Sequence, residues 1–86
     1  MHEMGLINDL LNKMDAIAKE QNASRITKAN VWLGALSHIS ADHFKGHFID
    51  GTAGTIAQGA ELEIEMSDDM NDPNAQSILL KSVDVD

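Results

Sequence analysis

Residues 60–66 read Ala-Glu-Leu-Glu-Ile-Glu-Met, and they form the clearest pattern in the chain. Apolar residues at positions 62, 64 and 66 alternate with glutamates at positions 61, 63 and 65. Successive side chains of a strand point to opposite faces, so this alternation fits a strand with one buried and one wet face. We therefore predict a half-buried β-strand here, with the glutamates on its wet side.

Two more strands are predicted, one on each side of this segment in the chain. Residues 26–34 also alternate with period two and are rich in β-branched residues, which favours a strand. Residues 67–76 consist of turn-forming residues, and residues 78–85 form the last strand. A bulge near Leu79 or Leu80 would reconcile the apolar run at the start of that strand with inward-facing Val83 and Val85.

Two helices complete the fold. Apolar residues recur at steps of three and four over residues 4–21, which predicts an amphipathic helix that ends near Asn22. Residues 37–51 form the second helical segment, with Ser40 as its N-cap. Its apolar seam is formed by Phe44, Phe48 and Ile49.

Glycines mark the second helix in two ways. Gly46 lies inside it and suggests close packing or a bend, because glycine weakens a helix interior. Gly51 is expected to stop it. The resulting order is α-β-α-β-β, which predicts two helices packed on a three-stranded sheet and places the protein in the α+β class.

The length and composition of the chain limit the classes of function that it can have. A chain of 86 residues forms one small domain with a modest core, and 43% hydrophobic and 23% charged residues are typical of globular proteins. Six basic and 14 acidic residues leave a net charge of −8 with neutral histidines, which argues against nucleic-acid and membrane binding. The sequence has no cysteine, which excludes disulfides, iron–sulfur clusters, thiol catalysis and cysteine-based zinc sites.

Sequence motifs of enzymes and of targeting are also missing. The chain has no phosphate-binding glycine loop, no Gly-x-Ser-x-Gly and no His-Glu-x-x-His, so we do not expect an enzyme. Its first residues carry neither a basic region nor a long apolar run, so we expect no signal peptide. No apolar run is long enough to span a bilayer, and we expect a cytoplasmic protein.

The first residues, Met1, His2 and Glu3, are the first candidate for chemistry. A bulky second residue generally prevents removal of the initiator methionine, so a free α-amine is expected on Met1. That amine, the His2 amide nitrogen and the His2 imidazole can close two adjoining chelate rings on one ion. Planar sites rich in nitrogen suit Ni(II) and Cu(II). The alternative is that His2 is an ordinary terminal residue with no role.

His43 and His47 are the second candidate. Four residues apart, they share a helix face and could chelate one metal ion. The alternative is that both histidines lie on a solvated helix face beside the phenylalanine seam. The spacing fixes no third ligand, although His38 and Asp50 are near in sequence.

Several of these segments together resemble the hydrogenase nickel-incorporation proteins of the HypA/HybF kind. The likeness lies in the start Met-His-Glu-Met, in residues 26–37, in residues 54–65 and in the closing strand at residues 79–85. The order of elements also resembles that of the family's nickel-binding domain. The likeness covers nearly the whole chain.

The resemblance implies a metallochaperone. Proteins of this family deliver Ni(II), as cargo, to the maturing [NiFe]-hydrogenase large subunit together with a nickel-handling GTPase, and in some organisms to urease. The family's Met-His-Glu start binds nickel, which carries over here to Met1, His2 and Glu3.

The chain also departs from the family. Relatives carry a zinc domain with two Cys-x-x-Cys pairs between the last two strands, where this chain has residues 67–76 and no cysteine. Structural zinc is therefore not expected, and residues 1–86 are expected to form a single nickel-binding domain. Many relatives also have an acidic residue where Ser40 stands.

Two hypotheses follow for the function. The first is a nickel metallochaperone. The second is a metal-independent interaction module of the same fold, which binds a maturation partner through the helix at residues 4–21. Either could form a homo-oligomer, because a small sheet has exposed edges.

Overall fold

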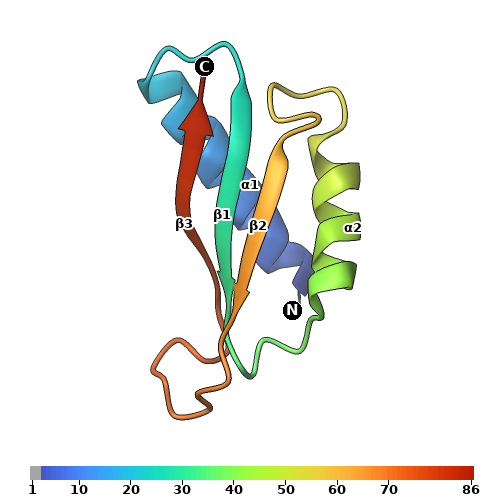
Figure 1. The fold of residues 1–86 in the computed structure, drawn as a ribbon, viewed down its shortest axis with the longest axis vertical. Coiled ribbons are helices and arrows are strands. Elements are labelled where there is room, and N and C mark those ends of the chain that lie inside the picture. The colour runs from blue at the N-terminus through green and yellow to red at the C-terminus, as the bar shows by residue number, and fades with distance from the viewer. Residues whose placement is uncertain (1–2) are drawn as a thin grey trace.

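The computed structural model describes the backbone of residues 3–86 and the side chains from residue 5 onward. Its elements follow the predicted α-β-α-β-β order, which confirms the α+β class (Figure 1). They are α1 (Glu3–Glu20), β1 (Ile26–Leu33), α2 (Ala41–Thr52), β2 (Glu61–Met66) and β3 (Ile78–Val85).

The sheet is mixed, with the strand order β2-β1-β3. β1 pairs in parallel with β2 and antiparallel with β3, so the first strand of the chain lies at the centre. Parallel neighbours need a crossover connection, and α2 is that connection. The loop at residues 67–77 then carries the chain past the end of β1 to the opposite edge (Figure 1).

Both helices contribute to one core on a single side of the sheet. Figure 1 shows α1 behind the sheet and α2 along its β2 side. Alternate residues of β1 are buried toward them, as the sequence predicted. The core side chains buried most completely are Ile7, Met14, Ile26, Val31, Leu33, Phe44 and Phe48.

The predicted end of the first helix and the predicted cap of the second are confirmed. Asn22 follows α1 with a left-handed φ of 54°, a conformation that asparagine tolerates better than most residues. Ser40 caps α2, since its hydroxyl oxygen accepts a hydrogen bond of 3.1 Å from the His43 backbone N–H. α2 therefore begins at Ala41 rather than at residue 37.

The bulge predicted in the last strand is present at Lys81, beside the expected position. Asn30 pairs with Ser82 while the next residue, Val31, pairs with Leu80, so one residue of β3 is left over. This extra residue lets Leu80 and Val83 both turn toward the core. Val85, which was expected to face inward as well, is 37% exposed at the end of the strand.

Several expectations about individual residues were wrong in whole or in part. Of the two alternatives for Gly46, a bend or close packing, the close packing is excluded, because Gly46 has open space beside it. A Cβ on Gly51 would lie 2.6 Å from Leu11 Cδ1, so the close packing is at Gly51. Gly51 does not stop the helix, which continues to Thr52. Ile49 is 56% exposed and is not part of the apolar seam, because it lies on the far side of α2 from Phe44 and Phe48.

Met66 is likewise 56% exposed, although its pattern predicted an inward side chain. It is the last residue of β2, which is an edge strand of the sheet. Neither helix within residues 3–86 has the length and apolar character needed to cross a membrane.

Candidate functional site

The expected nickel ligands lie at the start of α1. Met1 and His2 fall outside the described residues, and Glu3 is described only as the first residue of the helix. The helix that follows them is anchored, because Ile7, Leu10 and Met14 are at most 2% exposed. The core therefore fixes where α1 begins.

α1 begins at the same end of the molecule as α2 (Figure 1). The two helices touch at Leu11 and Gly51, where the missing Cβ allows the approach. Glu3 lies eight residues before Leu11, and His43 lies eight residues before Gly51, so each is about 12 Å back along its helix. The first turns of both helices thus belong to one region of the surface.

His43 and His47 lie in this region, on α2. Their ring centroids are 4.6 Å apart and the rings are tilted by 32°. His43 is exposed and His47 is half-buried. His43, His47 and Gly51 follow one another at steps of four, so they lie along one side of α2. Because Gly51 contacts Leu11 of α1, both histidines lie on the side of α2 that approaches α1.

No third ligand joins this pair in the described part of the chain. Groups of three or more histidine, aspartate or glutamate side chains with metal-binding geometry do not occur there. His38 is exposed in the turn before α2, with a φ of 61°, and Asp50 lies further along the helix.

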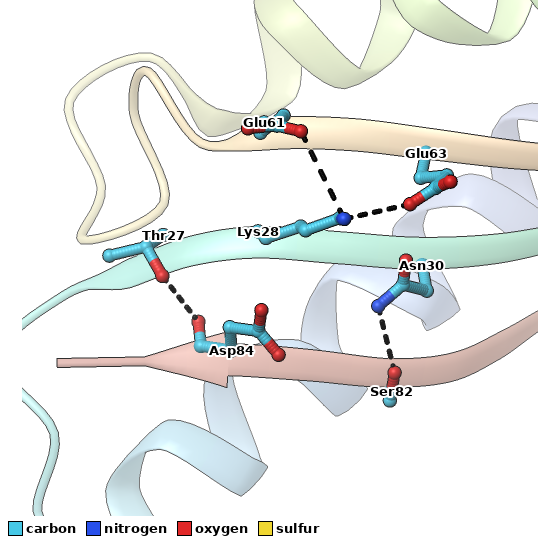
Figure 2. A network of polar contacts seen from close by, with 7 residues as sticks. All are labelled: Thr27, Lys28, Asn30, Glu61, Glu63, Ser82 and Asp84. Carbon is cyan, nitrogen blue, oxygen red and sulfur yellow. Dashed lines mark hydrogen bonds and ion pairs between the residues drawn. The ribbon is translucent and has the colours of Figure 1, made fainter.

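The glutamate row of β2 lies on the uncovered face of the sheet, as predicted. Lys28 lies between two of these residues, with its Nζ 2.7 Å from a Glu63 oxygen and 3.9 Å from a Glu61 oxygen (Figure 2). The hydrogen bond and the charge of Lys28 lower the pKa of Glu63, and the same contact raises the pKa of Lys28. These glutamates are therefore neutralised in part by lysines of the sheet itself.

The other contacts on this face also cross from strand to strand. Asn30 Nδ2 donates to Ser82 Oγ at 2.9 Å, and Lys81 Nζ donates to Glu65 Oε1 at 2.6 Å. Trp32 lies on this face as well, half-buried, and no helix within residues 3–86 covers it.

The acidic loop at residues 67–77 uses its carboxylates to hold its own shape. Asp69 Oδ1 accepts from the Asn71 N–H at 3.0 Å, and Asp72 Oδ1 accepts from the Asn74 N–H at 2.7 Å. The loop packs against Gly34, whose N–H donates a hydrogen bond of 2.9 Å to the Ser77 carbonyl oxygen. We interpret it as a structural turn.

Comparison with known proteins identifies the family. The family model described as "Hydrogenase/urease nickel incorporation, metallochaperone, hypA" matches residues 1–71, which include the start of the chain and every element through β2. The chain belongs to the HypA family. Curated HypA relatives agree with this assignment.

One relative is the hydrogenase maturation factor HypA of Chlorobium limicola, which is 35% identical over 65 residues, or 76% of this chain and 56% of the relative. Another is the hydrogenase maturation factor HypA of Dechloromonas aromatica, which is 39% identical over 64 residues, or 74% of this chain and 57% of the relative. The matched part thus spans slightly more than half the length of these relatives.

A solved HypA structure has the same fold. The solution structure of the Ni metallochaperone HypA from Helicobacter pylori superimposes with a TM-score of 0.78 at 17% identity. The alignment covers 99% of this chain and 97% of that one. At this level of identity the likeness concerns the fold alone.

Sequence patterns missed one feature of this region. The Leu11–Gly51 approach, which sets the two helices side by side, involves a glycine that looked like a helix stop. The sequence carried one signal against a helix stop at Gly51: the next residues, Thr52 and Ala53, can continue a helix.

Proposed function

We propose that this chain is a nickel metallochaperone that binds Ni(II) through Met1, His2 and Glu3 and assists its delivery during maturation of [NiFe]-hydrogenase or urease. The observation that carries the proposal is the family match, which begins at residue 1 and belongs to a family described by nickel incorporation. Its role is transfer of a cargo ion rather than catalysis.

The chemistry of the first residues supports this binding mode. The α-amine, the His2 amide nitrogen and the His2 imidazole supply three nitrogens in adjoining chelate rings, and nitrogen-rich planar sites suit Ni(II). An α-amine in a model peptide has a pKa of about 7.7–8.0, and an amine must lose its proton before it can coordinate a metal ion. Nickel binding should therefore tighten as the pH rises.

The anchored start of α1 supports the proposal in a second way. The buried side chains of Ile7 and Leu10 hold the helix on the core within two turns of Glu3. We infer that ligands attached to this fixed helix stay near one another and pass the ion to a partner. The proposed partners are a nickel-handling GTPase and the hydrogenase large subunit.

We also propose that the loop at residues 67–76 replaces the zinc domain of the family. The family match ends at residue 71, inside this loop. This loop alone joins β2 to β3, and it contains no cysteine. Residues 1–86 would then form a single nickel-binding domain.

Calorimetric titration of untagged protein with nickel tests the binding mode. We expect one tightly bound Ni(II) per chain, and we expect His2→Ala to abolish this binding because it removes the imidazole from the chelate. A His43→Ala/His47→Ala double variant is the control and should keep the tight site. Loss of tight binding in the double variant, with retention in His2→Ala, would move the site to α2.

Zinc content provides a further prediction. We expect no tightly held zinc in purified untagged protein, because the cysteine-free chain does not supply the four cysteine or histidine ligands of a structural site in one place. Elemental analysis of the purified protein tests this. One zinc per chain that survives dialysis against a chelator would contradict the prediction.

A further inference from the structure

The two histidines of α2 are arranged as a pair of ligands. Residues four apart on a helix lie one above the other, and here the imidazole centroids are only 4.6 Å apart. Two nitrogens bound to the same ion at about 2.0–2.1 Å lie roughly 3 Å from each other. Rotation of the two rings about their side-chain torsions can bring nitrogens to that separation while the helix backbone stays in place.

Both rings are available for binding. In the side chains described, no hydrogen bond or ion pair involves either imidazole, and the polar contact of His43 is made by its backbone N–H to Ser40. That contact fixes the first turn of α2 and so holds the backbone that carries the pair. His47 is half-buried, which limits the orientations its ring can adopt.

The electrostatic surroundings are negative on balance. α2 carries two exposed carboxylates, Asp42 and Asp50, against one exposed ammonium, Lys45, and the chain carries a net charge of −8. Such a surface raises the local concentration of divalent cations.

From this geometry we propose that His43 and His47 form a second metal site, which chelates one divalent cation of the class that prefers imidazole ligands: Ni(II), Cu(II) or Zn(II). Water completes the coordination, since no third protein ligand is assembled among the residues described. The site does not use the α-amine, and it stands whether or not the first residues bind nickel. With two protein ligands it binds more weakly than the terminal chelate.

The test uses full-length protein in which the terminal chelate is disabled by a Gly-Ser extension before Met1 together with His2→Ala. Titration with nickel chloride and, separately, with zinc chloride should show one ion bound per chain. The zinc-bound protein should show changes in the NMR signals of both imidazole rings at the same metal concentrations. Absence of binding in this protein would overturn the proposal.

Matched variants in the same background separate chelation from binding by single histidines. His43→Ala and His47→Ala should each lose the site. Lys45→His/His47→Ala keeps two histidines but places them two residues apart, on different faces of the helix, and should lose the site as well. Circular dichroism checks that each variant folds.

Two results in these variants would contradict the proposal. One is binding in Lys45→His/His47→Ala as tight as in the parent background, and the other is an NMR response confined to one ring. Failure of the terminal nickel site is a separate result, because that site is tested in protein with a free amine and an intact His2.

Discussion

At the scale of single residues, Gly34 and Gly46 occupy opposite kinds of surroundings. A Cβ on Gly34 would lie 2.2 Å from the carbonyl oxygen of Ala75, a backbone atom of the loop that packs there. A Cβ on Gly46 would have no neighbour within 4 Å. Packing therefore requires a glycine at position 34, whereas the glycine at position 46 only weakens its helix.

This contrast gives a stability prediction with an internal control. Gly34→Ala should lower the free energy of unfolding by about 1–3 kcal/mol, because the loop must move away from the new methyl group. Gly46→Ala should raise it by up to about 1 kcal/mol, because alanine favours the helix. Urea melts of the two variants measure both effects, and destabilisation by Gly46→Ala would contradict the open space seen beside it.

A second prediction at this scale concerns the Lys28–Glu63 contact. The Lys28 ammonium lowers the pKa of Glu63 below its ordinary value of 4.5. The contact therefore stabilises the fold above the ordinary pKa of the carboxyl group, and this contribution is lost as the pH falls through the lowered value. Because both groups are on a solvated face, we expect a small effect on stability.

NMR titration of the Glu63 carboxyl carbon tests the cause directly. Lys28→Met should raise the pKa of Glu63, whereas Lys81→Met should change it less, because Lys81 contributes only a minor attraction. Equal titration curves for the wild type and Lys28→Met would show that the contact does not form in solution.

At the scale of elements, the sequence predicted what depends on local pattern. The period-two alternation was confirmed as far as Ile64, and so were the caps at Asn22 and Ser40, because they follow from neighbouring residues alone. The positions of Ile49 and Gly51 were misjudged, because they depend on where α2 meets α1 and β2. The His43–His47 spacing was visible in the sequence, but the flank of the helix on which it lies was not.

Neighbouring residues of α2 test this assignment of faces. Phe48 is 2% exposed and lies in the core, so Phe48→Ala should cost about 3–5 kcal/mol of stability. Ile49 is 56% exposed, so Ile49→Ala should change stability by no more than about 0.5 kcal/mol. Similar urea midpoints for the two variants would mean that the face of α2 is wrongly assigned.

At the scale of the whole molecule, the topology was not available from the sequence. Whether β2 runs parallel or antiparallel to β1 depends on the crossover through α2, which local patterns do not specify. That crossover sets α2 beside α1, and both helices begin at the same end of the molecule (Figure 1). The His43–His47 pair belongs to the first two turns of α2. The candidate nickel ligands themselves were found from residue types and from the family resemblance, and they remain a proposal.

The central claim is that nickel is held by the free end of the chain. Calorimetric nickel titration of untagged protein, compared with the same protein carrying only Gly-Ser before Met1, tests it most directly. We predict one tight Ni(II) site in the untagged protein and its loss in the extended protein, because the extension moves the amine out of the chelate while leaving His2, His43 and His47 unchanged. Equally tight nickel binding by the extended protein would contradict the account.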